Sequence, residues 1–154
     1  NGIIAYAELE SPDVEQTLLK HMKYPNFRGI RQCLDYHPKY DNRRLAPRDD
    51  LMMDPLWHKG MKIMQKYDLI FDMQLYPMQL RLASIVAASY PNLRIVINHC
   101  AFPMLKEDYI SEWENGLKLI AQNPNVFIKL SGWGIVDQQF DKVSMKYIIQ
   151  TVVK

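Results

Sequence analysis

The chain has 154 residues, of which 48% are hydrophobic and 23% are charged, and this composition is typical of a folded globular protein and excludes a disordered segment. The formal net charge of +2 comes from basic residues scattered among acidic ones, which excludes the concentrated basic surface that nucleic-acid binding needs. No apolar stretch approaches the roughly 20 residues of a membrane-spanning helix, so we expect no membrane partner.

Strand-like and helix-like patterns alternate along the whole chain. A strand is expected over residues 3–9, and after Ser11-Pro12 the apolar residues Val14, Leu18 and Met22 recur at helical spacing. Further strands are expected over residues 28–34, 69–75, 93–97 and 126–130, and a polar loop over 35–53. Further helices are expected from Asp54-Pro55, from Pro77, over 110–120 and from about residue 140. The helix from Pro77 has Leu80, Ile85 and Ala88 on its apolar face. These elements make about five β/α units, which we assign to a single domain over residues 1–154.

Proline followed by asparagine separates a helix from the next strand three times, at Pro25-Asn26, Pro91-Asn92 and Pro124-Asn125. Repeated units with short helix-to-strand turns predict a parallel sheet, either in a (β/α) barrel or in a small doubly wound sheet. Five units cannot close an eight-stranded barrel, and the last helix is still amphipathic at Val153-Lys154. We therefore expect a segment of a longer protein.

His99 stands where the apolar run from Ile95 to Ile97 ends and a loop through Pro103 begins. In parallel α/β proteins the carboxyl ends of the strands carry the chemistry, because side chains there point into the cleft formed by the following loops. His99 is therefore the first candidate for a functional residue. The alternative is a core histidine whose ring bonds a backbone carbonyl.

Other chemistries have little support in the sequence. No GxGxxG follows a strand, and neither a P-loop nor a GxSxG elbow is present. Cys33 and Cys100 have no CxxC spacing, so we expect neither a disulfide framework nor a structural zinc site. A reducing environment, and with it a cytoplasmic location, is the resulting expectation.

Separated motifs run through nearly the whole chain: Phe27-Arg28-Gly29-Ile30-Arg31, Asp54-Pro55-Leu56-Trp57, Phe71-Asp72-Met73-Gln74, Tyr90-Pro91-Asn92, Ile97-Asn98-His99, Trp113, Pro124-Asn125-Val126 and Lys129-Leu130-Ser131-Gly132. Together they resemble the amidohydrolase-related family, the branch of the amidohydrolase superfamily that contains sugar-lactone and pyrone-dicarboxylate lactonases. The resemblance implies a partial (β/α)8 TIM barrel in which this chain supplies the second to sixth strands. It also implies, for the full-length protein, hydrolysis of a lactone or similar cyclic ester by attack of water.

In this resemblance His99 falls on the histidine that ends the fifth strand, which polarises the substrate carbonyl or binds a metal. The family's His-x-His pair in the first strand and its aspartate in the eighth have no counterpart here, so this chain alone is expected to be inactive. The full-length protein is expected to hold zinc or another divalent metal, or none, because some lactonases of the family act without one.

Candidate substrate-binding residues come from three of the expected strands and one loop. Arg28 and Arg31 lie on opposite faces of one strand, so only one of them can point into a barrel. A buried guanidinium needs a partner, which would be either a carboxylate or hydroxyl of the substrate or a structural carboxylate of the protein. Further candidates for substrate contacts are Gln74, Tyr76, Lys129 and Trp133, while Asp72 fits a buried structural acceptor. Lys129 could equally extend to the surface, and Trp133 could equally pack within its loop.

The loop from Asp35 to Asp50 would lie on the active side of a barrel, either as a lid or, in the interpretation that we favour, as a solvated mobile segment. Two other functions stay open: decarboxylation by a relative in the same superfamily, and a non-catalytic truncated paralogue or half barrel that associates with another chain. The expected partner is a small-molecule lactone or cyclic ester. Open sheet edges would favour a homo-oligomer.

Overall fold

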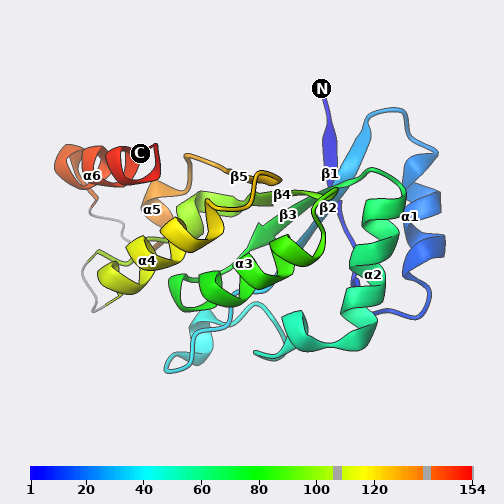
Figure 1. Ribbon diagram of the computed structural model, residues 1–154, viewed down its shortest axis with the longest axis horizontal. Helices are drawn as coiled ribbons and strands as arrows, with labels where there is room; N and C mark the ends of the chain where they lie inside the picture. Colours follow the sequence, from blue (N-terminus) through cyan, green and yellow to red (C-terminus); the bar gives the residue numbers. More distant parts are fainter. Residues whose placement is uncertain (106–108, 137–139, 154) are drawn as a thin grey trace.

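The computed structural model describes residues 1–105, 109–136 and 140–153 and contains one sheet of five parallel strands (Figure 1). The strands are β1 (Ile3–Tyr6), β2 (Phe27–Cys33), β3 (Ile70–Gln74), β4 (Arg94–Ile97) and β5 (Val126–Ile128). Their order in the sheet is their order in the chain, and each neighbouring pair is parallel. The predicted alternation of strands and helices is confirmed.

Helices follow the strands in turn. They are α1 (Val14–Met22), α2 (Pro55–Lys66), α3 (Leu80–Ser89), α4 (Ile110–Ile120), α5 (Trp133–Val136) and α6 (Lys142–Val152). The start of α2 shows how the sequence sets these boundaries: the carboxylate of Asp54 accepts hydrogen bonds from the N–H groups of Leu56 and Trp57, and Pro55 occupies the first turn. No helix among the described residues is long and apolar enough to cross a membrane.

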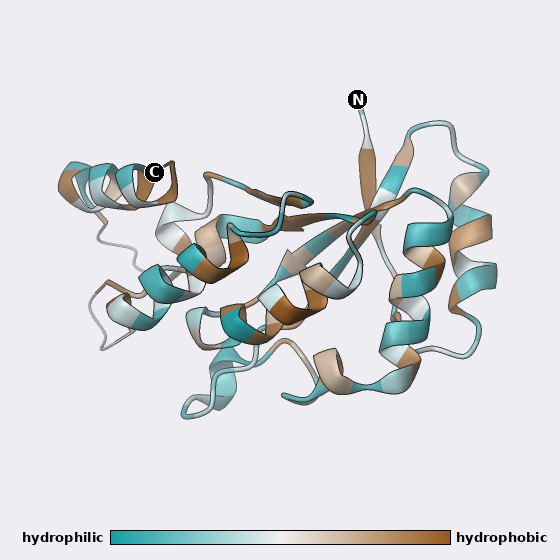
Figure 2. Ribbon diagram, viewed as in Figure 1, coloured by the Kyte–Doolittle hydropathy of each residue, from teal (hydrophilic) through white to brown (hydrophobic). Residues whose placement is uncertain are grey.

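The outer face of the sheet is covered by helices. Ile30, Phe71 and Ile95 share this face and have no exposed area, and the Trp57 ring of α2 lies edge-on to the Phe71 ring with 5.8 Å between their centroids. Figure 2 shows the apolar residues of β4 at the centre and helices with one hydrophilic and one hydrophobic side. Burial of this apolar area is the main source of stability for the fold.

The opposite, inner face carries one side chain from each strand in a single row: Tyr6, Arg31, Asp72, Val96 and Phe127. Tyr6 is 61% exposed and Phe127 is 54% exposed, so this face is open at both ends of the row. Because the strands are in sequential order without a switch point, the fold is a partial (β/α)8 barrel whose sheet is not closed. The alternative of a doubly wound sheet is wrong, since that fold reverses its strand order part-way across.

Two details of the expected elements are corrected. In α3 the buried residues are Leu80, Ala83, Val86 and Ala87, whereas Ile85 is 60% exposed. Ile85 is five residues after Leu80, which at 3.6 residues per turn places it away from the buried stripe. The strands β1 and β5 are also shorter than predicted, ending at Tyr6 and Ile128.

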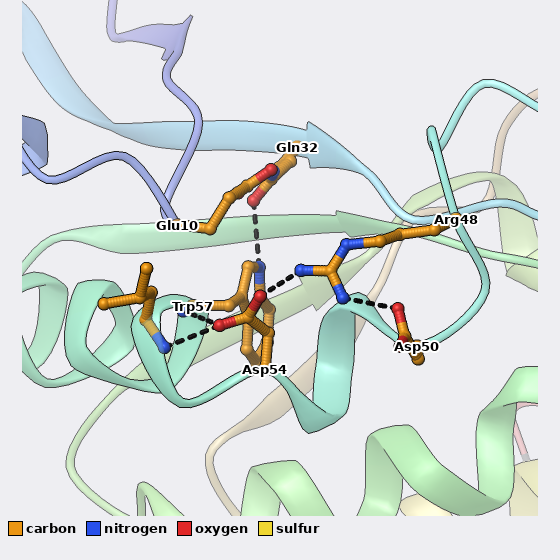
Figure 3. Close-up of polar contacts among 7 residues, drawn as sticks. Glu10, Gln32, Arg48, Asp50, Asp54 and Trp57 are labelled. Atoms are coloured by element: carbon orange, nitrogen blue, oxygen red, sulfur yellow. Dashed lines mark hydrogen bonds and ion pairs between the residues drawn. The ribbon is translucent and has the colours of Figure 1, made fainter.

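The connection between β2 and α2 is buried at some points, whereas residues 38–42, 45, 47 and 49 are exposed. Its residues Asp35, His37 and Ala46 are buried. Near its end, the guanidinium of Arg48 bonds both Asp50 and Asp54, which ties the loop to the start of α2 (Figure 3). Burial and polar contacts thus anchor the loop near both ends, and mobility of its exposed middle stays a prediction.

Figure 3 also shows how Gln32 of β2 is joined to Trp57 at the start of α2. Gln32, on the outer face of β2, donates to Glu10 at 2.7 Å and accepts the indole N–H of Trp57 at 2.9 Å. The Gln32 amide thus links Glu10, which lies between β1 and α1, to Trp57 of α2. Both its nitrogen and its oxygen have a hydrogen-bond partner, as expected for a buried polar group.

Candidate active site

Three charged side chains meet on the inner face of the sheet. Arg31 on β2 donates from Nη2 to Oδ2 of Asp72 on β3 at 3.1 Å, and Nζ of Lys129, directly after β5, bonds the same oxygen. The Asp72 side chain is only 2% exposed, while Arg31 and Lys129 are 39% and 36% exposed. Two cations share one carboxylate, so this cluster carries one surplus positive charge.

Asn98 extends the cluster toward the end of β4. Its Oδ1 lies 3.4 Å from Nη2 of Arg31, and the residue has no exposed area. Two donors here, Nε of Arg31 and Nδ2 of Asn98, are buried without a hydrogen-bond partner among the described residues. A buried unpaired donor is unfavourable by about 1–3 kcal/mol, so an acceptor oxygen at this point would be stabilising.

His99 follows Asn98 immediately and is half-buried. Its Nδ1 lies 3.0 Å from the hydroxyl of Ser131, and its ring stacks on that of Phe102 with 5.4 Å between centroids. Gly132 passes directly against the imidazole with a φ of +76°, and a Cβ at this position would come within 2.6 Å of the ring. Only glycine allows both this conformation and this approach.

The surroundings of His99 favour its neutral form. Burial lowers the pKa of the imidazole, and the positive charges of Arg31 and Lys129 lower it further, while Asp72 acts in the opposite direction. A neutral imidazole has a free electron pair at one nitrogen, which can accept a proton or bind a metal.

A second polar pair lies one step further along the same face. Nε2 of Gln74 donates to Oδ1 of Asp35 at 3.2 Å, and both residues are buried. Burial raises the pKa of the Asp35 carboxyl above its ordinary value. Asp35 was not predicted as a candidate, although it stands two residues after Cys33 in the alternation that also includes Arg31.

The remaining predicted residues separate into two groups. Tyr76 is buried against Phe102 with 5.5 Å between ring centroids, which places it one ring away from His99. Trp133 helps to line a small cavity beside His99. Arg28 lies apart: it is exposed at the start of β2, where its guanidinium donates to the carbonyls of Pro25 and Phe27 at 2.8 Å. The structure therefore brings Arg31, Gln74, Tyr76, Lys129, Trp133 and His99 near the carboxyl ends of the strands, whereas Arg28 lies at the opposite end of β2.

The space beside His99 is narrow. The cavity bordered by His99, Ser131 and Trp133 has a volume of about 10 Å³, which is room for about one water molecule. A larger hollow of about 450 Å³ lies along β5 between α4 and α6, but its lining contains none of the candidate residues.

A metal centre is not complete in the described part of the chain. A catalytic zinc ion usually has about three protein ligands, from His, Cys, Asp or Glu. No group of three or more such residues in the described ranges could hold a metal. His99 can therefore supply at most one ligand, and the residues present do not fit a zinc site by themselves.

The sequence matches the Amidohydrolase family over residues 2–149. The chain belongs to this family. This amidohydrolase chain is 31% identical over 153 residues to the uncharacterized protein y4mH of Sinorhizobium fredii, covering 99% of this chain and 51% of that protein. It is 33% identical over 131 residues to an L-fucono-1,5-lactonase of Burkholderia ambifaria, covering 85% of this chain and 42% of the lactonase.

A zinc-bound amidohydrolase from Burkholderia multivorans has the same fold as this amidohydrolase chain, with a TM-score of 0.79 at 20% identity. That comparison covers 99% of the present chain and 52% of the other. The predicted family and the partial barrel are thus confirmed. The amidohydrolase chain spans about half the length of the proteins that it matches.

Proposed function

We propose that the protein containing this chain hydrolyses a lactone or similar cyclic ester by attack of water on the ring carbonyl. The observation that carries the proposal is the position of the His99 imidazole, at the carboxyl end of β4 next to Ser131, where burial and the charges of Arg31 and Lys129 lower its pKa. The similarity to an L-fucono-1,5-lactonase supports a lactone as the substrate class.

Ester hydrolysis places a negative charge on the carbonyl oxygen as water adds. Positive groups held in a partly dry site stabilise this charge strongly, because they need no rearrangement during the reaction. We assign this role to Arg31 and Lys129, which Asp72 holds in place. Since Nδ1 of His99 is engaged by Ser131, its Nε2 is the nitrogen that we assign to polarise the carbonyl or to exchange a proton.

The unpaired donors indicate what else the substrate carries. Nε of Arg31 and Nδ2 of Asn98 both need an acceptor, and the cluster has a surplus positive charge. We infer that a carboxylate or a hydroxyl oxygen of the substrate binds near Arg31. In this proposal Tyr76 and Trp133 form walls of the site, and Gln74 acts through Asp35.

The test uses the full-length protein and a set of sugar lactones, with acid release and carbon dioxide release followed in parallel. His99→Ala should lower kcat/KM by about 10²- to 10⁴-fold. His21→Ala, which changes a histidine of α1 distant from the cluster, should leave kcat/KM unchanged. Equal activity of the His99→Ala variant, or carbon dioxide as the product, would overturn the hydrolase proposal.

A further inference from the structure

The turn that carries His99 has an unusual backbone. His99, Cys100, Ala101 and Phe102 have φ values of 53°, 54°, 58° and 49°, so four consecutive residues other than glycine are left-handed. This conformation is unfavourable for a residue with a side chain, because its Cβ approaches the following carbonyl oxygen too closely. It persists only where surrounding contacts determine it, and such strain is concentrated at functional sites.

Three contacts hold the middle of this turn. The N–H and the thiol of Cys100 both donate to the carbonyl of Lys129, at 3.1 and 3.3 Å. The carbonyl of Cys100 accepts the indole N–H of Trp113 at 2.7 Å. Trp113 has no exposed area and comes from α4, so it is the side chain that fixes the turn from outside the sheet.

We propose that Trp113 is a positioning residue for His99, a role that rests on the proposed function of the same site. The indole N–H keeps the Cys100 carbonyl turned toward α4. The left-handed turn then sets the imidazole between the Phe102 ring and the Ser131 hydroxyl. Without this bond the strained turn relaxes, and the imidazole leaves both partners.

A second buried tryptophan provides a matched control. Trp57 on α2 also has no exposed area, and its indole N–H also donates one hydrogen bond, to Gln32 at 2.9 Å. Trp57→Phe and Trp113→Phe remove the same atoms and the same kind of bond. A merely structural role of Trp113 would make the two variants alike.

The measurement is the NMR spectrum of selectively labelled histidine at fixed pH in the full-length protein. Trp113→Phe should shift the ring protons of His99, because they leave the ring current of Phe102, and should move its Cα signal away from the left-handed value. Trp57→Phe should leave the His99 signals unchanged while losing a similar free energy of unfolding. Unchanged His99 signals in Trp113→Phe, or equal shifts in both variants, would overturn the proposal.

Two further variants keep the test decisive. Glycine adopts left-handed φ without strain, so Ala101→Gly in the Trp113→Phe background should restore the His99 signals, and failure to restore them would count against positioning through the turn. If Trp113→Phe does not fold, site-specific replacement of Trp113 by benzothienylalanine removes the N–H and keeps the ring shape; unchanged His99 signals would again refute the role.

These spectra do not depend on turnover, so they separate this inference from the hydrolase proposal. If lactones are hydrolysed, Trp113→Phe should lower kcat more than it raises KM, and Trp57→Phe should change neither. If lactones are not hydrolysed, the His99 signals alone still decide whether Trp113 positions the imidazole.

Discussion

Lys129 and Asp72 form an ion pair that crosses a whole strand. Lys129 follows β5 and Asp72 lies on β3, so the lysine side chain passes over β4 to reach the carboxylate. Arg31 approaches the same carboxylate from β2 at 3.1 Å. The buried carboxylate of Asp72 on β3 thus links Arg31 of β2 with Lys129, which follows β5. It holds in place the two cations that we assign to the substrate carbonyl.

Asp72→Asn should destabilise the protein by about 1–3 kcal/mol, because two cations lose a buried counter-charge. The measurement is the free energy of unfolding in urea. Asp68→Asn is the control: Asp68 pairs with Arg94 at the same 3.1 Å, but its side chain is 83% exposed. Surface pairs contribute little, so a loss in Asp68→Asn equal to that in Asp72→Asn would contradict the special role of Asp72.

Gly132→Ala should disturb His99 and lower stability by about 1–3 kcal/mol, because the new Cβ meets the imidazole at 2.6 Å in a left-handed conformation. Gly134→Ala should have little effect, since the nearest atom to its Cβ is 3.6 Å away. Thermal unfolding and the His99 ring signals distinguish the two variants. Equal behaviour of both would show that the close approach has no consequence.

Asp35 should make stability depend on pH. Burial raises the pKa of its carboxyl in the folded state, so the folded protein retains this proton to higher pH than the unfolded chain. The stability contributed by protonated Asp35 is complete below the unfolded pKa of about 3.9 and is lost as the pH rises through the folded pKa.

Asp35→Asn should therefore gain most stability at neutral pH and little at acid pH, while its Oδ1 still accepts from Gln74. Urea unfolding between about pH 3.5 and pH 8 checks this. Asp49→Asn, an exposed acid in the same loop, controls for loss of a charge. A gain for Asp35→Asn that is constant across this range would rule out the buried carboxyl as the cause.

Ala101→Gly should be nearly neutral for stability. Relief of a left-handed alanine contributes about 1–2 kcal/mol, while the added flexibility of glycine and the lost buried methyl group cost about 1 kcal/mol each, so the net loss is about 0–1 kcal/mol. Ala83→Gly removes an equally buried methyl from α3, where the backbone is unstrained, and should lose about 1.5–2 kcal/mol. Similar losses in both variants would show that the turn at His99 stores no strain.

The candidate site could be predicted from the sequence only at single positions. His99 was identifiable because an apolar strand stops just before it, and Arg31 because a charge inside an apolar strand needs a partner. The sharing of Asp72 by Arg31 and Lys129 could not be predicted, since it joins residues 41 and 57 positions from Asp72. Nor does any local pattern indicate that Trp113 bonds the Cys100 carbonyl.

The sequence by itself determined the alternation of five strands with helices, because periodicity and turn chemistry are local properties of the chain. Tertiary structure decided that the strands run in sequential order, which makes a partial barrel, and that the connection between β2 and α2 is anchored through Asp35, His37 and Arg48. It also decided the left-handed turn at His99, where contacts from Lys129 and Trp113 outweigh the preference of four ordinary residues for negative φ.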